Sequence, residues 1–350
     1  MKLVMLKNQT IYLLFGLLLV LIYLILGSGL HGDDYVVISN FRSSNFGDFI
    51  TINVEKIMKF NIATYYSFWF FYFSLGEEHQ WVYDSIKIVS HAISFFLVYK
   101  FSTDYLPKDR AVLVSLIFIL YPLHDTTAYW YMTAPYILIP ATILYAHHLI
   151  RNNKTTLGFF VSMLGAFSYY ISPPYIFGLS VIFLFEKNFK KAAIFVIPGA
   201  LYVVYYFWIK FNYAGVERRI NLDLSILDYL KQILIQPLSF LESAIGPSYW
   251  LKVFYVIESI SLVSVIIVSV ISVFAFLKVK KISKTPVLSK SLLAGLVSVL
   301  ILSFGMYALT GLYSHSAFNL GNRSTVYGSL LIAFLLVTFL PANKKSVVFL

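Results

Sequence analysis

Long runs of apolar residues follow one another along most of this chain, and they constrain its fold more than any other feature. A helix needs about 20 mainly apolar residues to cross a bilayer. The sequence offers ten candidates, at 10–29, 82–101, 110–123, 134–150, 156–171, 174–186, 192–210, 251–277, 291–312 and 325–341. Only 12% of the residues are charged, about half the share in a soluble domain. This excludes a soluble enzyme, a disordered chain and a disulfide-stapled secreted domain. We expect an all-α polytopic membrane bundle.

The basic residues predict which helix ends face the cytoplasm. With ten spans and a cytoplasmic N-terminus, the inner segments are 1–9, 100–110, 151–155, 186–191, 278–290 and 342–350. They hold 17 of the 27 Lys and Arg residues but only three of the 16 acidic residues. This distribution follows the positive-inside rule, so the net charge of +11 is a topology signal and predicts no nucleic-acid partner. Both termini are expected in the cytoplasm. Without an organelle signal, a bacterial cytoplasmic membrane is the default location.

The chain is expected to form one transmembrane domain over residues 1–350, with two long outer loops at 30–81 and 211–250. An aromatic stretch at 64–73 within the first loop is short for a span and rich in Tyr. It predicts a helix that lies at the membrane interface or re-enters the bundle. Residues 1–29 could be a signal peptide, but the apolar run is long and no A-x-A-like cleavage site follows. We therefore expect a retained first helix. Ser172-Pro173-Pro174 predicts a tight helical hairpin, because Pro ends helices.

A pair of carboxylates follows the first expected span, in the segment His31-Gly32-Asp33-Asp34-Tyr35. Two adjacent carboxylates at the mouth of a membrane helix are costly to bury and can do acid/base or metal chemistry. Because adjacent residues do not share a helix face, one would point into a site and the other would support it. The alternative interpretation is a polar helix cap.

A second cluster, residues 121–130, joins the third and fourth expected spans. Within it, His124 and Asp125 could form an acid/base pair or ligate a metal. Two ligands are too few to claim a metal, so a divalent ion stays open and no cofactor is predicted. The alternative is a polar turn within an aromatic belt at the membrane surface.

The third cluster, residues 315–327, leads into the last expected span, and Arg323 is its only charged residue. A cation near a helix N-terminus opposes the helix dipole. A phosphate would favour it, since Arg offers planar bidentate donors and helix-start amides add more. The alternative is an Arg that snorkels to lipid headgroups. Within the second expected span, Lys87 and His91 are spaced i, i+4 and share a face.

In this order the clusters resemble the GT-C glycosyltransferases, most closely their O-mannosyltransferase-like branch. Asp33-Asp34, an apolar run and Asn40 are similar to the first-loop motif of that branch, and His91 with Leu97-Val98-Tyr99 is similar to its second-helix motif. Residues 121–130 match the pattern H-P-x-H-T-E-x-x-x-W at Pro122, His124 and Trp130, although Tyr121 replaces its first His. Asn322-Arg323 and Tyr327 resemble its late motif more loosely.

The resemblance implies an inverting glycosyltransferase that uses a polyprenyl-phosphate-linked sugar at the outer face of the membrane. Asp34, or Asp33, would be the general base that takes a proton from a glycan, lipid or protein acceptor. Arg323 would stabilise the departing phosphate. His124 and Asp125 would orient the acceptor or the carrier phosphate, and the neighbouring Tyr35 and Asn322 are further substrate-binding candidates.

The main alternative function is a transporter or flippase of a lipid-linked sugar, in which Arg323 holds the phosphate and no bond is broken. Such a protein lines its path with charged residues at mid-membrane depth. Lys87, His91 and Glu258 are few for that role. A polysaccharide polymerase, an acyl-transferring enzyme and a structural subunit of an envelope complex are further alternatives.

Overall fold

The computed structural model describes residues 16–22, 24–25, 30–31, 34–35, 79–212, 220, 224–278, 283–284, 287–310 and 314–340. These residues form helices and no strand, so the expected all-α class is confirmed for the described part of the chain. Asp33, the aromatic stretch 64–73 and both termini lie outside the described residues, as do most of the first expected span and the first outer loop.

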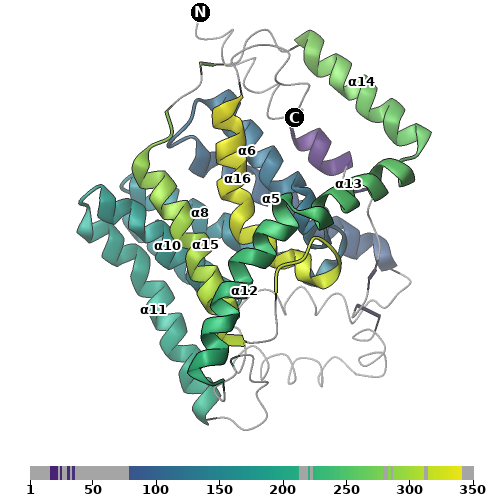
Figure 1. The fold of residues 1–350 in the computed structure, drawn as a ribbon. Coiled ribbons are helices and arrows are strands. Elements are labelled where there is room, and N and C mark those ends of the chain that lie inside the picture. The colour runs from purple at the N-terminus through teal and green to yellow at the C-terminus, as the bar shows by residue number, and fades with distance from the viewer. Residues whose placement is uncertain are drawn as a thin grey trace, which may run out of the picture.

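A bundle of eight principal helices forms the body of the described structure (Figure 1). They are α5 (Gln80–Ser102), α6 (Lys108–Leu120), α8 (Pro135–Arg151), α9 (Thr155–Ser168), α10 (Ser172–Phe185), α11 (Phe189–Asn212), α15 (Lys290–Thr310) and α16 (Val326–Phe339). Helix α5 packs on α6 and α8, α8 packs on α9, and α10 contacts both α11 and α15. Helix α16 closes the bundle against α6 and α15. Each helix begins and ends within three residues of an expected span.

Four described segments are long and apolar enough to cross a membrane, namely Gln80–Ser102, Phe189–Ile209, Lys290–Thr310 and Gly321–Phe339. A bent helix pair provides a fifth, and the helices α9 and α10 are apolar but shorter. The protein is therefore a helical membrane protein. Helix α9 ends at Ser168 and α10 begins at Ser172 with two prolines in its first turn, which confirms the expected hairpin.

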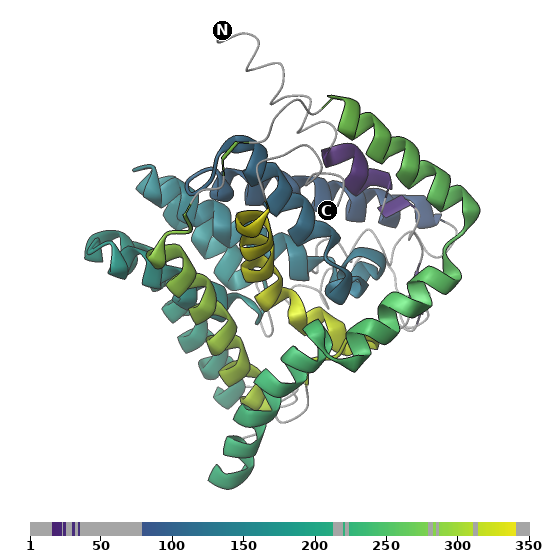
Figure 2. The same ribbon diagram turned by 45° about the horizontal axis from the view of Figure 1, so that its top comes forward.

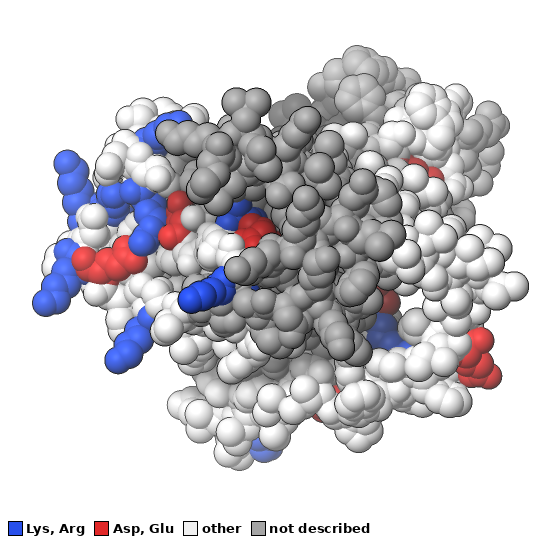
Figure 3. All heavy atoms as spheres, turned by 90° about the horizontal axis from the view of Figure 1, so that it is seen from above, with Lys and Arg blue, Asp and Glu red and all other residues white. Residues whose placement is uncertain are grey.

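One end of the bundle, which we call the basic end, carries the turns after α5, α8 and α10. Asn153 and Lys187 adopt left-handed backbone conformations there, with φ of 64° and 56°. The amide of the next residue then reaches back to the helix, since Lys154 N donates to Leu149 O at 2.9 Å. Figure 3 looks down on this end and shows Lys and Arg side chains gathered on the side where α8, α10 and α11 lie.

Arg110 is a buried residue that links several segments at the basic end of the bundle. Its buried guanidinium donates to the carbonyl oxygens of Val337, of Leu340 at 3.1 Å and of Ser283 at 3.0 Å. These contacts join the start of α6 to the end of α16 and to the linker before α15. Three carbonyl acceptors use the N–H donors of the buried guanidinium, and Asp109 lies within electrostatic range of it.

The second long segment departs from the expected loop at 211–250, because most of it is helical. Helix α12 spans Ile226–Ile245, and the Ser225 hydroxyl caps it by accepting from the amide of Asp228 at 3.1 Å. Helix α13 (Pro247–Ser259) follows directly, and α14 (Leu262–Lys278) leaves it across a bend of 102°. The expected span 251–277 is therefore two helices that meet at residues 260–261. Figure 2 shows this arm running along the edge of the bundle.

Candidate functional site

Three polar segments that are far apart in the sequence meet at the end of the bundle opposite the basic end, which we call the site end. The link between α6 and α8 consists of η2 (Pro122–His124), α7 (Thr126–Tyr129) and η3 (Tyr131–Thr133). It contacts η4 (Asn319–Thr325), where the Thr325 hydroxyl donates to Leu123 O at 2.9 Å. It also contacts the short described piece around Asp34.

Asp34 is held by hydrogen bonds to both of its carboxylate oxygens. Its side chain is fully buried. One carboxylate oxygen accepts from the indole N–H of Trp130 at 3.1 Å, and the other accepts from the backbone N–H of His31 at 3.0 Å. Two N–H donors stabilise a negative charge in a buried site. Tyr35, the next residue, is half exposed.

Lys87 provides the positive charge beside Asp34. Its ammonium lies 3.2 Å from an oxygen of Asp84, donates to Tyr129 O at 3.0 Å, and lies within electrostatic range of Asp34. Only 1% of its side chain is exposed. The pairing with two carboxylates explains why a buried Lys is tolerated here.

His91 and His124 are two buried histidines near this charged group, and they lie within electrostatic range of each other. His91 Nδ1 contacts Lys87 O at 2.8 Å, so this nitrogen carries the proton, because a carbonyl can only accept. His124 Nδ1 contacts the Thr127 hydroxyl at 3.0 Å, and that hydroxyl donates to His124 O. Neither Nε2 has a hydrogen-bond partner within the described structure. Burial lowers the pKa of His124 to about 3, so this ring is neutral.

Asp125 turns away from His124 and binds elsewhere, so the two neighbours do not form the acid/base pair that we considered. One oxygen of Asp125 lies 2.8 Å from the ammonium of Lys252 on α13, and the other accepts from the side-chain N–H of Asn322. Asn322 in turn accepts from the hydroxyl of Thr126, and Lys252 also donates to Ala317 O at 2.9 Å. This network joins α13 to the link between α6 and α8 and to the segment that contains η4.

Lys252 was not predicted as a site residue, although the sequence contains a feature that points to it. Lys252 is a lone cation at the outer end of the expected span 251–277, and the positive-inside rule disfavours Lys on that side of the membrane. A misplaced cation of this kind indicates a specific anionic partner, and Asp125 is that partner.

Arg323 lies on the other side of η4, among tyrosines. Its guanidinium carbon is 5.7 Å from the centre of the Tyr136 ring, which is a cation–π arrangement. Tyr169, Tyr170 and Tyr307 lie within electrostatic range, and the hydroxyls of Tyr136 and Tyr170 are hydrogen-bonded to each other. No sequence feature singles out these four tyrosines among the 27 Tyr residues of the chain. The cluster places a guanidinium beside tyrosine hydroxyls, a combination of groups that can bind an oxyanion.

Metal chemistry receives no specific support from the described side chains. No group of three or more His, Asp or Glu residues within the described ranges is placed to hold a metal ion.

Comparison of the chain with protein-family models, with curated proteins and with solved structures gives no match. The resemblance to GT-C glycosyltransferases therefore rests on the motifs and on their order along the chain.

Proposed function

We propose that this protein is an inverting glycosyltransferase of GT-C type. It transfers a sugar from a polyprenyl-phosphate carrier to a glycan, lipid or protein acceptor. The observation that carries the proposal is the meeting of the three motif-bearing segments at the site end. Asp34 is held by Trp130, and Asn322 is held by Asp125 and Thr126. A carboxylate, a guanidinium and their supporting groups thus come to one end of a membrane bundle.

The proposed chemistry is a single displacement. Asp34 accepts the proton of the acceptor hydroxyl, whose oxygen forms a bond to the anomeric carbon. The bond from that carbon to the phosphate oxygen breaks on the opposite side, so the configuration inverts. Charge in the transition state is oxocarbenium-like on the sugar, as in glycoside hydrolysis. The electron pair leaves with the polyprenyl phosphate, and Arg323 stabilises the growing negative charge.

The proposed topology places the site end outside. Ten spans with both termini in the cytoplasm put the Lys-rich turns at 151–154 and 186–191 inside, as the positive-inside rule favours. The membrane is then the bacterial cytoplasmic membrane. A lipid carrier explains why the catalyst is built from membrane helices, because the carrier tail stays in the bilayer throughout the reaction.

The test is mass spectrometry of lipid products from the purified, reconstituted protein. It is supplied with a panel of polyprenyl-phosphate sugars and simple acceptors. Wild type should release polyprenyl phosphate. Asp34→Asn should slow release by about 10²–10⁴-fold, because it removes only the base. Asp228→Asn is the matched control, since Asp228 is an exposed carboxylate on α12, and it should keep wild-type turnover.

Two outcomes would count against the proposal. Unchanged turnover in Asp34→Asn would remove the base assignment. Donor binding without release, lost in Arg323→Ala, would favour the transporter of a lipid-linked sugar instead.

A further inference from the structure

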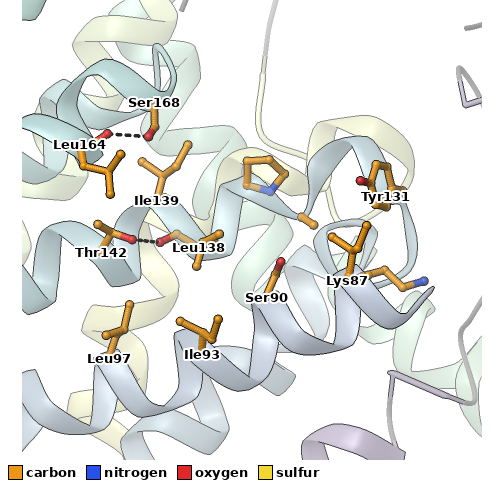
Figure 4. Close-up of a pocket in the computed structure, with 13 residues that line it drawn as sticks. Lys87, Ser90, Ile93, Leu97, Tyr131, Leu138, Ile139, Thr142, Leu164 and Ser168 are labelled. Carbon is orange, nitrogen blue, oxygen red and sulfur yellow. Dashed lines mark hydrogen bonds between the residues drawn. The ribbon is translucent and has the colours of Figure 1, made fainter. Parts of the chain in front are cut away.

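A groove of about 210 Å³ lies between α5, α8 and α9, next to the candidate site but not part of it (Figure 4). Its walls are mainly Ile86, Ile93 and Leu97 of α5, Leu138 and Ile139 of α8, and Leu164 of α9. The α5 residues from Lys87 to Leu97 follow one another along one face, so the groove runs about 15 Å along the helix axis.

The groove is mainly apolar, although Ser90, Thr142 and Ser168 add hydroxyls to its lining. Thr142 donates to Leu138 O at 2.8 Å, and Ser168 donates to Leu164 O at 2.5 Å, each within its own helix (Figure 4). Their donor hydrogens are therefore used, and the wall offers a ligand little beyond apolar surface. A free sugar would lose its hydrogen bonds to water in such a groove without replacing them, whereas a hydrocarbon chain would gain by burial.

The groove opens sideways from the bundle. Ile93 and Leu164 are about half exposed; Ile93 lies near the middle of α5, and Leu164 lies one turn before the end of α9. An exposed position near the middle of a membrane helix faces hydrocarbon and not water. A ligand would thus enter from the bilayer. The volume is below the usual range of about 300–1,000 Å³ for a pocket that encloses a whole small molecule, which suits a segment of a single chain.

One end of the groove reaches the candidate site. Lys87 and Tyr131 lie together at this end (Figure 4). Lys87 also contacts Asp84 and Tyr129, and Tyr131 directly follows Trp130, whose indole N–H binds Asp34. A chain in the groove would therefore bring its headgroup out of the groove at the Lys87 ammonium, at the edge of the candidate site.

We infer that this groove binds the first isoprene units of a single-chain prenyl phosphate lipid, whose headgroup leaves the groove past Lys87 and Tyr131 toward the candidate site. The inference rests on the proposed function for the identity of the headgroup. It assigns Ile93, Leu138 and Leu164 as residues that recognise the carrier chain.

The experiment measures binding and not turnover. The full chain is reconstituted in nanodiscs and labelled with a polyprenyl phosphate that carries a diazirine near its phosphate end. The labelled peptides should come from α5, α8 and α9. Leu164→Trp fills the groove and should lower labelling at least about tenfold, because displacing only two methylene groups changes binding by about that factor.

The matched control is Leu157→Trp, on the same helix. Leu157 is 53% exposed and Leu164 is 52% exposed, but only Leu164 lines the groove. A second pair on α5 is Ile93→Trp with Val89→Trp as its control, and it guards against a folding defect in α9. Equal labelling in Leu164→Trp and Leu157→Trp, or labels outside the three helices, would overturn the inference.

Competition identifies the kind of lipid. Unlabelled polyprenyl phosphate should displace the probe, and phosphatidylglycerol at the same concentration should not. Equal displacement by phosphatidylglycerol would overturn the assignment and indicate a site for a bilayer lipid. Groove labelling without sugar transfer would disprove the proposed function alone, whereas transfer without groove labelling would disprove this inference alone.

Discussion

At the scale of single residues, the ion pair between Asp125 and Lys252 is one of the contacts that join the arm α12–α14 to the site end. The two charges lie 2.8 Å apart, and their side chains are 25% and 11% exposed. Partial exposure weakens such a pair, but Asn322 and Ala317 O supply further hydrogen bonds to the same two groups. A partly buried charge that loses its partner is left with an unmet desolvation cost.

We predict that Lys252→Met lowers the free energy of unfolding by about 1.5–3 kcal/mol, the range for hydrogen bonds to charged groups. Thermal unfolding in detergent measures the change. The double variant with Asp125→Asn should be less destabilised than the sum of the two single variants, because the interaction is lost only once. Strictly additive losses would mean that the pair contributes no coupling. The exposed pair Lys231 and Asp228, with side chains 61% and 51% exposed, is the control and should show almost none.

Two buried histidines make the protein sensitive to acid. Burial lowers the pKa of His124 to about 3 and the pKa of His315 to about 3. An unfolded His titrates near pH 6.5. Below that pH the histidines of the unfolded chain bind protons, whereas those of the folded chain stay neutral. The free energy of unfolding is therefore highest above about pH 6.5 and falls as the pH is lowered toward 3. The loss approaches about 1.4 kcal/mol per pH unit for each histidine.

Unfolding temperatures between pH 7.5 and 5.5 test this sensitivity, because most carboxylates stay ionised over that range. His315→Phe should reduce the slope, since the ring sits among Phe240, Phe304 and Tyr307 and Phe cannot be protonated. A flat wild-type profile over this range would show that the folded protein accommodates both protons.

At the scale of elements, α10 and α15 pack through small residues. A Cβ added at Gly178 would lie 2.5 Å from the backbone nitrogen of Val299, and one added at Gly295 would lie 2.4 Å from Ile182. Backbone atoms cannot move aside as a flexible side chain can. Close approach through Gly is common where membrane helices associate, since the apolar solvent gives them no hydrophobic drive.

We predict that Gly178→Ala costs about 1–3 kcal/mol by overpacking this contact. Gly305→Ala is the control in the same helix pair, because nothing lies within 4 Å of its Cβ position. There the substitution should be neutral or stabilise by about 0.4–1 kcal/mol. Unfolding in detergent compares the two variants, and equal effects would argue against the close contact of α10 and α15.

The helices could be predicted from the sequence where apolar residues are continuous, and less well where they are periodic. Helix α12 was missed because its apolar residues recur every three or four positions among polar ones. Leu227, Leu230, Leu234, Leu238 and Leu241 form an exposed stripe, while Gln236 and Phe240 are buried on the opposite side. An exposed apolar stripe on such a helix is typical of the membrane interface. The break between α13 and α14 at residues 260–261 contains no Pro or Gly, so no helix-breaking residue predicts it.

The candidate site was predictable in part for a related reason. Motifs mark Asp34, His124, Asp125 and Asn322, and the helix order brings their segments together. Pairing is a tertiary property, however. No spacing shows that Asp125 binds Lys252, more than 120 positions away, and not His124 beside it.

At the scale of the whole molecule, two contacts indicate that α14 crosses from one end of the bundle to the other. Before it, Lys252 is held at the site end by Asp125. After it, the amide of Ser283 donates to Asp109 at 2.6 Å, and its carbonyl accepts from Arg110 at the basic end. The 17 residues of α14 span about 25 Å as a helix, close to the thickness of a hydrocarbon core. A bent pair of helices can also return to its starting side, but these anchors lie at opposite ends.

Single introduced cysteines test this crossing cleanly, because the chain has no Cys of its own. We predict that a membrane-impermeant maleimide labels Asp228→Cys in sealed spheroplasts. Lys154→Cys and Lys284→Cys should react only after permeabilisation. Labelling of Lys284→Cys together with Asp228→Cys would make α13–α14 a re-entrant pair and reverse every later helix. Labelling of Lys154→Cys and Lys284→Cys without labelling of Asp228→Cys would mean that the whole protein is inverted and that Asp34 faces the cytoplasm. The lipid-linked donor would then have to be met on that side, so this measurement also decides where the proposed chemistry takes place.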